Sequence, residues 1–264
     1  MTEPLVSIIA PAYNKQGTIN QSLQSIFDQS YSNWELIVVD DASTDSTKNM
    51  LGIISEPRMK KIYLVKNQGV VNAYREGIKR AKGKYIMFHD TDDMSLPDRI
   101  EKCVAGIGDA DVLYHSMYVM ARHPDPQIPI MARAYRPAQK WEEERIYKEQ
   151  YIPGIIFAKA EILKKVITDF PKEAEQAWDW MHHILLHQAG AKYTNIREGL
   201  YEYYRFPTTS LSNKNEMDGT RQKSMKWIQQ WLLKNKIVKK NHVFGKGFKG
   251  TIKGKEERPN AKNR

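Results

Sequence analysis

Residues 84–99 read KYIMFHDTDDMSLPDR, and this stretch decides the fold. The apolar run before His89 is short and continuous, which is typical of a strand buried on both faces of a sheet. Three carboxylates follow within four positions, at Asp90, Asp92 and Asp93. Like charges this close together make one another harder to ionise. We therefore expect a positive charge to lie against the end of this strand.

Strand-like and helix-like segments alternate through the first hundred residues. Short apolar runs predict four strands, at residues 5–10, 35–40, 61–66 and 84–89. Helical spacing predicts helices between them, one after a Thr18 cap, one capped within Ser43–Asp45, and one over 70–81. Such alternation favours an α/β fold with a doubly wound, mostly parallel sheet that is flanked by helices.

The remainder of the chain is less regular. It predicts one or two strands at 111–122, a strand and then a helix within 151–166, a helix over 173–189, a strand at 199–206 and an amphipathic helix at 218–235. After Lys239 the chain is rich in Gly and Lys. That composition buries little apolar surface, so we expect disorder from about residue 245.

The net charge of +10 is concentrated at one end of the chain. Residues 205–264 hold 16 Lys and Arg against 4 Asp and Glu, a net of +12, which leaves −2 for the rest. A basic block of this kind attracts nucleic acid, an anionic membrane surface or an acidic glycan. The alternative is a solvated tail that only keeps the protein soluble.

Composition also bears on the compartment. The chain is 41% apolar and 27% charged, as is usual for soluble proteins, and no apolar run approaches the ~18 residues that span a bilayer. The first residues do not read as a signal peptide, and a single cysteine, Cys103, allows no internal disulfide. We expect a cytoplasmic protein, free or peripheral at the inner face of the membrane.

Polar residues follow each of the four predicted strands. They are Pro11-Ala12-Tyr13-Asn14, Asp40-Asp41, Asn67-Gln68-Gly69 and Asp90-Thr91-Asp92-Asp93. Any one of these groups could be a turn or a helix cap. Because ligands bind beyond the carboxyl ends of parallel strands, four such groups together favour a ligand site.

The chain contains neither G-x-G-x-x-G after the first strand nor a G-x-x-x-x-G-K-[ST] loop, which disfavours dinucleotide oxidoreductases and P-loop hydrolases. A carboxylate-rich site without such a loop indicates Mg²⁺ or Mn²⁺ as the phosphate binder, because these ions prefer oxygen ligands. The charge of the ion would also offset the repulsion among the acids.

The ordered motifs PAYN, VVDDASTDST, NQG and GIKRAKGKYIMFHDTDD resemble the nucleotide-sugar half of family 2 glycosyltransferases, which have the GT-A fold. The resemblance covers residues 5 to about 100, and more loosely extends to about 206. It implies sugar transfer with inversion from a nucleotide diphosphate donor, for which we expect a UDP-sugar. It also implies a donor half at 1–110, an acceptor and base half at 111–217 of the same domain, and a helix with a basic tail at 218–264.

The resemblance assigns the donor-binding residues by position. Pro11, Ala12 and Tyr13 would line the base and ribose pocket, beside Asn14 and Asn67, and Asp41 would hydrogen-bond the base. Asp90 and Asp92 form the Asp-x-Asp pair.

In that pair Asp90 would contact the ribose or the donor sugar, and Asp92, with Asp90, would ligate Mn²⁺ or Mg²⁺. Asp93 would be a further acid of this motif or a cap of the next helix with Ser95. Arg205, in YEYYRF, would approach the diphosphate or belong to a structural strand.

The catalytic base is expected in AEQAWDWMHHILLHQAG, residues 174–190. Asp179 matches the acid of the family motif, Trp178 stands where the family usually has Glu, and Glu175 is a rival base. The chain also departs from the family at Tyr74, where an arginine is usual, although Arg75 follows.

Asp179, His183 and His187 share a helix face and offer an alternative metal site. The Gln-x-x-Arg-Trp element of processive synthases is absent, so we expect single additions. The expected acceptor is a glycan or lipid-linked saccharide. Two alternatives remain, sugar transfer to a nucleic-acid base or other polyanion through the basic tail, and a non-catalytic nucleotide-sugar-binding module. Nucleotidyl transfer is disfavoured because it usually needs a Gly- and Arg-rich loop after the first strand.

Overall fold

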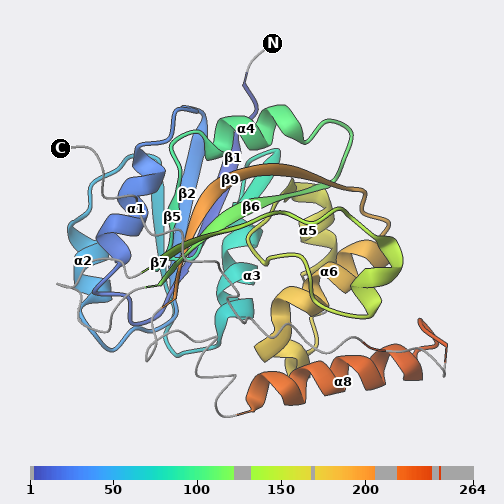
Figure 1. Cartoon of the computed structure of the whole chain (residues 1–264). Coiled ribbons are helices and arrows are strands. Elements are labelled where there is room, and N and C mark those ends of the chain that lie inside the picture. The colour runs from blue at the N-terminus through green and yellow to red at the C-terminus, as the bar shows by residue number, and fades with distance from the viewer. Residues whose placement is uncertain (1–2, 122–131, 168–169, 206–218, 240–243, 245–264) are drawn as a thin grey trace.

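A computed structural model describes residues 3–121, 132–167, 170–205, 219–239 and 244. Within these residues nine strands form one sheet in the order β3-β2-β1-β4-β8-β6-β9-β5, with β7 paired to β6 (Figure 1). The expected strand at 111–122 is a single strand. The residues from 245 onward, for which we expect disorder, fall outside the described residues.

The N-terminal half alternates strands and helices as predicted. Its elements are β1 (Val6–Ala12), α1 (Ile19–Phe27), β2 (Trp34–Asp40), α2 (Thr47–Ile53), β3 (Met59–Tyr63), α3 (Val70–Arg80) and β4 (Tyr85–Phe88). β1 pairs in parallel with both β2 and β4, and β2 pairs in parallel with β3. The carboxyl ends of these four strands therefore meet at one edge of the sheet.

The second half extends the same sheet with strands of mixed direction. Its elements are β5 (Met94–Ser95), α4 (Arg99–Gly106), β6 (Val112–Ala121), β7 (Ala132–Arg136), η1 (Glu143–Tyr147), β8 (Phe157–Lys159), α5 (Ala160–Val166), η2 (Lys172–Ala177), α6 (Trp178–Gln188), β9 (Tyr193–Arg205) and α8 (Thr220–Lys234). β8 joins antiparallel to β4, and β6 joins antiparallel to β8. The sheet is thus continuous from the first half to the second.

Apolar side chains cover both faces of the sheet. Alternate residues of β1 point to opposite faces, so Ile8 packs with α1, α2 and α4, while Ile9 packs with α3, α5 and α6. α8 adds Ile228 and Leu232 to the second face, and it lies along one edge of the molecule in Figure 1. This three-layer arrangement explains why the strand interiors are almost purely apolar.

Several expected boundaries were wrong. The strand expected at 61–66 covers 59–63. α2 begins at Thr47, and Asp45, one of the residues expected to cap it, accepts the N–H of Thr47 at 2.9 Å. The hydroxyl of Thr18 does not cap α1 but donates to the carbonyl of Thr91 at 2.9 Å. The helix expected over 173–189 is a 3-10 turn, η2, followed by α6. Asp179 therefore lies in the first turn of a new helix.

No helix among the described residues is both long enough and apolar enough to cross a membrane.

Candidate functional site

Asp90 lies at the carboxyl end of β4 and is held from two sides. The hydroxyl of Tyr74 donates to its carboxylate at 2.9 Å, and its own N–H donates to the hydroxyl of Tyr201 at 3.0 Å. Burial and the neighbouring charge of Asp92 raise the pKa of Asp90 to about 6, although the bond from Tyr74 opposes the shift. Its charge is therefore costly in the protein alone and calls for a cation.

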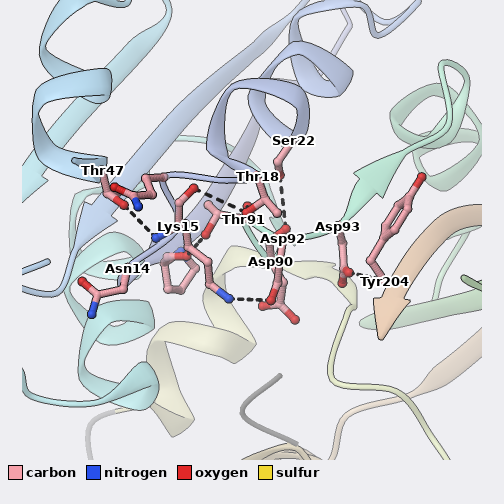
Figure 2. Close-up of polar contacts among 12 residues, drawn as sticks. Asn14, Lys15, Thr18, Ser22, Thr47, Asp90, Thr91, Asp92, Asp93 and Tyr204 are labelled. Atoms are coloured by element: carbon pink, nitrogen blue, oxygen red, sulfur yellow. Dashed lines mark hydrogen bonds and ion pairs between the residues drawn. The ribbon is translucent and has the colours of Figure 1, made fainter. Parts of the chain in front are cut away.

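That cation is Lys15, a residue that the sequence analysis did not single out. Its ammonium forms an ion pair with Asp92, as Figure 2 shows. Burial lowers the pKa of Lys15, but Asp92, Asp90 and Asp93 together raise it above its ordinary value. The compensating charge expected from the acidic stretch thus comes from a loop 77 positions earlier in the chain.

Asp93 is fully buried and does not cap a helix, which corrects one of its two expected roles. Its carboxylate accepts the N–H of Tyr204 at 2.7 Å, and the residue before α4 is Asp98. Burial and the charges of Asp92 and Asp90 raise the pKa of Asp93 well above its usual value. Asp93 therefore anchors the acidic turn to β9 from a fully buried position.

A second buried cation, Arg99, lies beneath the acidic turn and was also not predicted. It donates to His115 at 3.0 Å, to Ser95 at 2.9 Å and to the carbonyl of Phe88 at 3.0 Å. Its guanidinium stacks on the ring of Tyr201 at 4.5 Å. Nothing in PDR distinguishes this arginine from a surface helix residue, because its partners come from distant strands.

The end of β1 combines an exposed aromatic ring with a fixed backbone. Tyr13 is 43% exposed, whereas the methyl group of Ala12 lies in the core. The carbonyl of Pro11 accepts the hydroxyl of Thr91 at 2.7 Å, which joins this strand end to the acidic turn. Asn14 has a φ of 52°, and its side-chain oxygen accepts the N–H of Thr44 at 2.8 Å. The ring of Tyr13 is the surface that a base could stack on here.

Asp41 lies at the end of β2 and binds the backbone that leads into α3. Its carboxylate accepts the N–H groups of Gln68 at 2.7 Å and Gly69 at 2.8 Å. Burial raises the pKa of Asp41, and these two bonds oppose the shift. Asn67, just before them, is exposed. Each oxygen of Asp41 keeps a lone pair, so the predicted bond to a base remains a prediction.

Glu175 belongs to this side of the site. Gly69 has a φ of 85°, a backbone conformation that favours glycine, and a Cβ added there would lie 1.6 Å from the Oε1 atom of Glu175, so Glu175 lies directly against this turn. Burial raises the pKa of Glu175, and the charge of Asp41 adds to the shift while Lys172 opposes it. Glu175, the alternative candidate for the catalytic base, therefore lies near Asp41, the residue expected to bind the nucleobase of the donor.

Asp179 has different neighbours. Gln150 donates to one of its oxygens, and the guanidinium of Arg221, from α8, lies 3.3 Å from the other. The ring of the preceding residue, Trp178, packs on Tyr74 with centroids 5.0 Å apart. Since Tyr74 also holds Asp90, two packed rings connect the candidate base to the acidic turn.

Two more arginines lie on the Asp179 side. Burial lowers the pKa of Arg136. The nearby negative charge of Asp179 opposes this shift, whereas the positive charge of Arg205 adds to it. Arg205 ends β9, opposite Ala121 of β6. Arg75, in contrast, points elsewhere and donates to the carbonyl of Ile167 at 3.1 Å. Arg75, which follows the position where the family usually has an arginine, therefore makes its contact at α5 and not at the acidic turn.

The histidines of α6 do not form the alternative metal site. His183 contacts the hydroxyl of Tyr193 at 3.2 Å and the carbonyl of Pro153 at 3.0 Å, while His187 lies 3.4 Å from Glu143. In the described parts of the chain no group of three or more His, Cys, Asp or Glu side chains is placed to hold a metal. Asp90 and Asp92 offer two carboxylates. This set suits a divalent ion whose remaining ligands come from the phosphates of the substrate.

Comparison with known proteins gives a consistent result. The model of the family described as Glycosyl transferase family 2 matches residues 7–167. The chain is 40% identical over 102 residues to the putative teichuronic acid biosynthesis glycosyltransferase TuaG of Bacillus subtilis, covering 38% of this chain and 40% of that protein.

A second relative comes from Escherichia coli. It is the UDP-Glc:alpha-D-GlcNAc-diphosphoundecaprenol beta-1,3-glucosyltransferase WfgD, 39% identical over 101 residues, which cover 38% of this chain and 40% of WfgD. The chain thus aligns with about two fifths of the length of these relatives.

Among solved structures, S. aureus TarS 1-349 in complex with UDP-GlcNAc superposes with a TM-score of 0.64 at 20% identity, over 84% of this chain and 65% of the TarS 1-349 chain. That likeness shows the fold, an α/β fold of the GT-A type. The family model covers more than half of the chain, so the chain belongs to glycosyl transferase family 2.

Proposed function

We propose that this protein transfers a sugar from a UDP-sugar to an acceptor hydroxyl, one sugar at a time and with inversion. The observation that carries the proposal is the arrangement around the two packed rings. Tyr74 holds Asp90 at the donor side, and Trp178 places Asp179 on the other side of the same contact. The proposed donor residue Asp90 and the candidate base Asp179 are thus linked through the contact of these two rings.

In this proposal the donor lies over the carboxyl ends of β1, β2 and β4. Tyr13 stacks on the base, and Asp41 accepts a hydrogen bond from it. Asp90 contacts the ribose or the sugar. Asp90 and Asp92 would hold Mg²⁺ or Mn²⁺, which stabilises negative charge on a departing diphosphate. UDP is favoured because WfgD and the TarS complex carry UDP-sugar names.

Asp179 acts as the general base. Its carboxylate accepts the proton of the acceptor hydroxyl as the oxygen attacks the anomeric carbon, and UDP leaves from the opposite face. The reacting carbon passes through an oxocarbenium-like state, as in glycoside hydrolysis. Gln150 and Arg221 hold the carboxylate in one orientation, which reduces the entropy lost on the way to the transition state.

The proposed acceptor is a glycan or a lipid-linked saccharide. The names of TuaG and WfgD support this, since one is assigned to teichuronic acid synthesis and the other to a diphosphoundecaprenol-linked sugar. Contact of the basic C-terminal segment with an anionic membrane would bring the protein to a lipid-linked acceptor.

Two measurements test this function. Calorimetric titration of UDP with and without Mn²⁺ should show binding that the metal strengthens. A panel of nucleotide sugars should show slow hydrolysis of one donor, which identifies the sugar. A folded protein that binds no nucleotide diphosphate would refute the proposal. Binding without any turnover, with acceptors supplied, would favour a non-catalytic module.

A further inference from the structure

Lys15 lies in the turn between β1 and α1, where its ammonium forms an ion pair with Asp92. Its side chain is 25% exposed and that of Asp92 is 21% exposed, so the ion pair is partly shielded from water. Among the described residues, Asp90, Asp92 and Asp93 form one ion pair between them, the one from Asp92 to Lys15. Lys15 therefore occupies the place of a counter-ion in the protein alone.

The turn that carries Lys15 is held in place by its backbone. The N–H of Lys15 donates to the hydroxyl of Thr47 at 2.7 Å, and the N–H of Gln16 donates to Asp45 at 3.1 Å. Thr18 reaches the carbonyl of Thr91 at 2.9 Å on the other side, as Figure 2 shows. Bonds to α2 and to the acidic turn thus fix the Cα atom of Lys15 beside the site.

The backbone of the turn is held by these hydrogen bonds, but the ammonium group of Lys15 can change its position. An ammonium sits on a flexible four-carbon stem and can exchange one anionic partner for another within reach. A divalent cation bound to Asp92 would repel the ammonium, while a diphosphate bound to that cation would attract it. The same side chain thus opposes the metal in the empty site and favours the donor in the filled one.

We propose that Lys15 is a donor-binding residue that exchanges partners, leaving Asp92 for the diphosphate of the donor when a divalent cation takes the carboxylate. This inference rests on the proposed function and adds a residue and a coupling to it. Metal and nucleotide then bind cooperatively. The metal releases Lys15 from Asp92, so that it can bind the diphosphate, and the diphosphate holds the ammonium away from the metal. By thermodynamic linkage, each ligand strengthens the binding of the other by the same factor.

The test compares the wild-type protein with Lys15→Met, a neutral side chain of similar length. Binding of Mn²⁺ alone is followed by electron paramagnetic resonance of the free ion, and UDP binding by calorimetry at saturating Mn²⁺. We expect Mn²⁺ alone to bind at least about fivefold more tightly to the variant, and UDP with Mn²⁺ at least about fivefold more weakly, within the usual range of coupling between sites. The two shifts have opposite signs.

Lys60→Met serves as the matched control, because it removes a lysine that pairs with Glu35 at the start of β2, away from the site. It should leave both affinities unchanged. If Lys15 were only structural, Lys15→Met would weaken both ligands or neither, and either result would overturn the inference. Failure of the proposed function itself looks different, since the wild-type protein would then bind no UDP under any condition.

Asp92→Asn provides a second test that does not depend on the folding of the lysine variant. It frees Lys15 from its ion pair while it removes the metal ligand. UDP without metal should bind this variant about as tightly as the wild type or more tightly, and Mn²⁺ should no longer strengthen the binding. Weaker binding of UDP without metal would contradict the exchange of partners.

Discussion

Asp179 is the residue on which the proposed chemistry depends, so Asp179→Asn is the first prediction. The amide keeps a similar shape but cannot take a proton, and general base catalysis typically contributes about 10²–10⁴-fold to the rate. We expect kcat to fall by that factor while the affinity for UDP stays the same. Steady-state kinetics and calorimetry measure the two quantities.

Glu175→Gln is the matched control, because Glu175 lies against Gly69 beside Asp41 and apart from the neighbours of Asp179. It should alter donor affinity more than kcat. Full activity in Asp179→Asn with lost activity in Glu175→Gln would exchange the two roles.

The raised pKa of Asp90 leads to a prediction about the stability of the fold. Its pKa is raised to about 6 by burial and by Asp92, against about 4 in an unfolded chain. Between these values the folded protein binds a proton that the unfolded chain releases, so this group makes stability fall as pH rises from about 4 to 6.

Asp90→Asn removes that cost, and the Tyr74 hydroxyl can still donate to the amide oxygen. The free energy of unfolding should rise on the order of 1–3 kcal/mol at pH 7.5 and change little at pH 3.5. Urea unfolding at the two pH values measures this. Asp109→Asn, at an exposed carboxylate, should have no such effect. A loss of stability at pH 7.5 would mean that Asp90 is held by bonds an amide cannot make.

At the residue scale the sequence predicted acids better than their partners. Asp90, Asp92, Asp41 and Asp179 all follow strand ends or open a helix, and those positions are readable from local patterns. Lys15 could be expected only as an unnamed positive charge, since its partner is distant in the sequence.

Tyr74 and Trp178, the two departures from the family pattern, contact each other. No local pattern shows that. The sequence alone left them as separate anomalies in the donor half and the base half.

At the scale of elements, α8 supports the turn that carries the candidate base. The hydroxyl of Ser224 donates to the carbonyl of Glu173 at 2.7 Å, and Arg221 donates to the carbonyl of Gln176 at 3.1 Å as well as approaching Asp179. Both carbonyls belong to η2, the 3-10 turn before α6. The position of α6 thus depends on a helix more than forty residues later in the chain.

Arg221→Leu should therefore lower kcat with little change in UDP affinity, because Asp179 loses a fixed partner. A displaced catalytic group can cost about 10- to 100-fold in rate. Lys223→Leu, an exposed change on the same helix, is the control, and Arg221→Lys should restore part of the activity. An equal fall for both leucine variants would point to general damage to α8.

The boundaries of elements were the least predictable feature. The apolar period of 173–189 is continuous, yet the chain forms a 3-10 turn to Ala177 before α6 begins at Trp178. η2 is bonded to α8, which lies more than forty residues later in the chain, and that contact has no local signature. The strand of two residues, β5, was not predicted because its pairing with β9 alone defines it.

At the scale of the whole molecule, the N-terminal half and the second half of the described chain share one sheet and one core. β4 lies between β1 and β8, and one apolar cluster includes both Ile9 of β1 and Trp180 of α6. The site is therefore set where two parts of the chain pack together. The alternation of strands and helices predicted the first part well, whereas the mixed strands of the second part depend on long-range pairing.

The basic C-terminal segment is the last feature with a proposed role, which is attraction to an anionic membrane. Residues 240–264 carry eight Lys and Arg against two Glu, and each basic residue near such a surface contributes about 1 kcal/mol. A chain that ends at Lys239 should lose most of its binding to vesicles that contain anionic lipid, as measured by sedimentation. The binding of the full chain should weaken as salt screens the charges.

UDP affinity should be equal for the two chains, because every proposed donor residue precedes residue 206. Duplex DNA, tested in parallel, separates a membrane role from a nucleic-acid role. Tighter binding to DNA than to vesicles, with a steep dependence on salt, would favour the polyanion alternative. Equal vesicle binding by both chains would show that residues 240–264 do not bind the membrane. The exposed lysines of α8 would then be the next candidates for that contact.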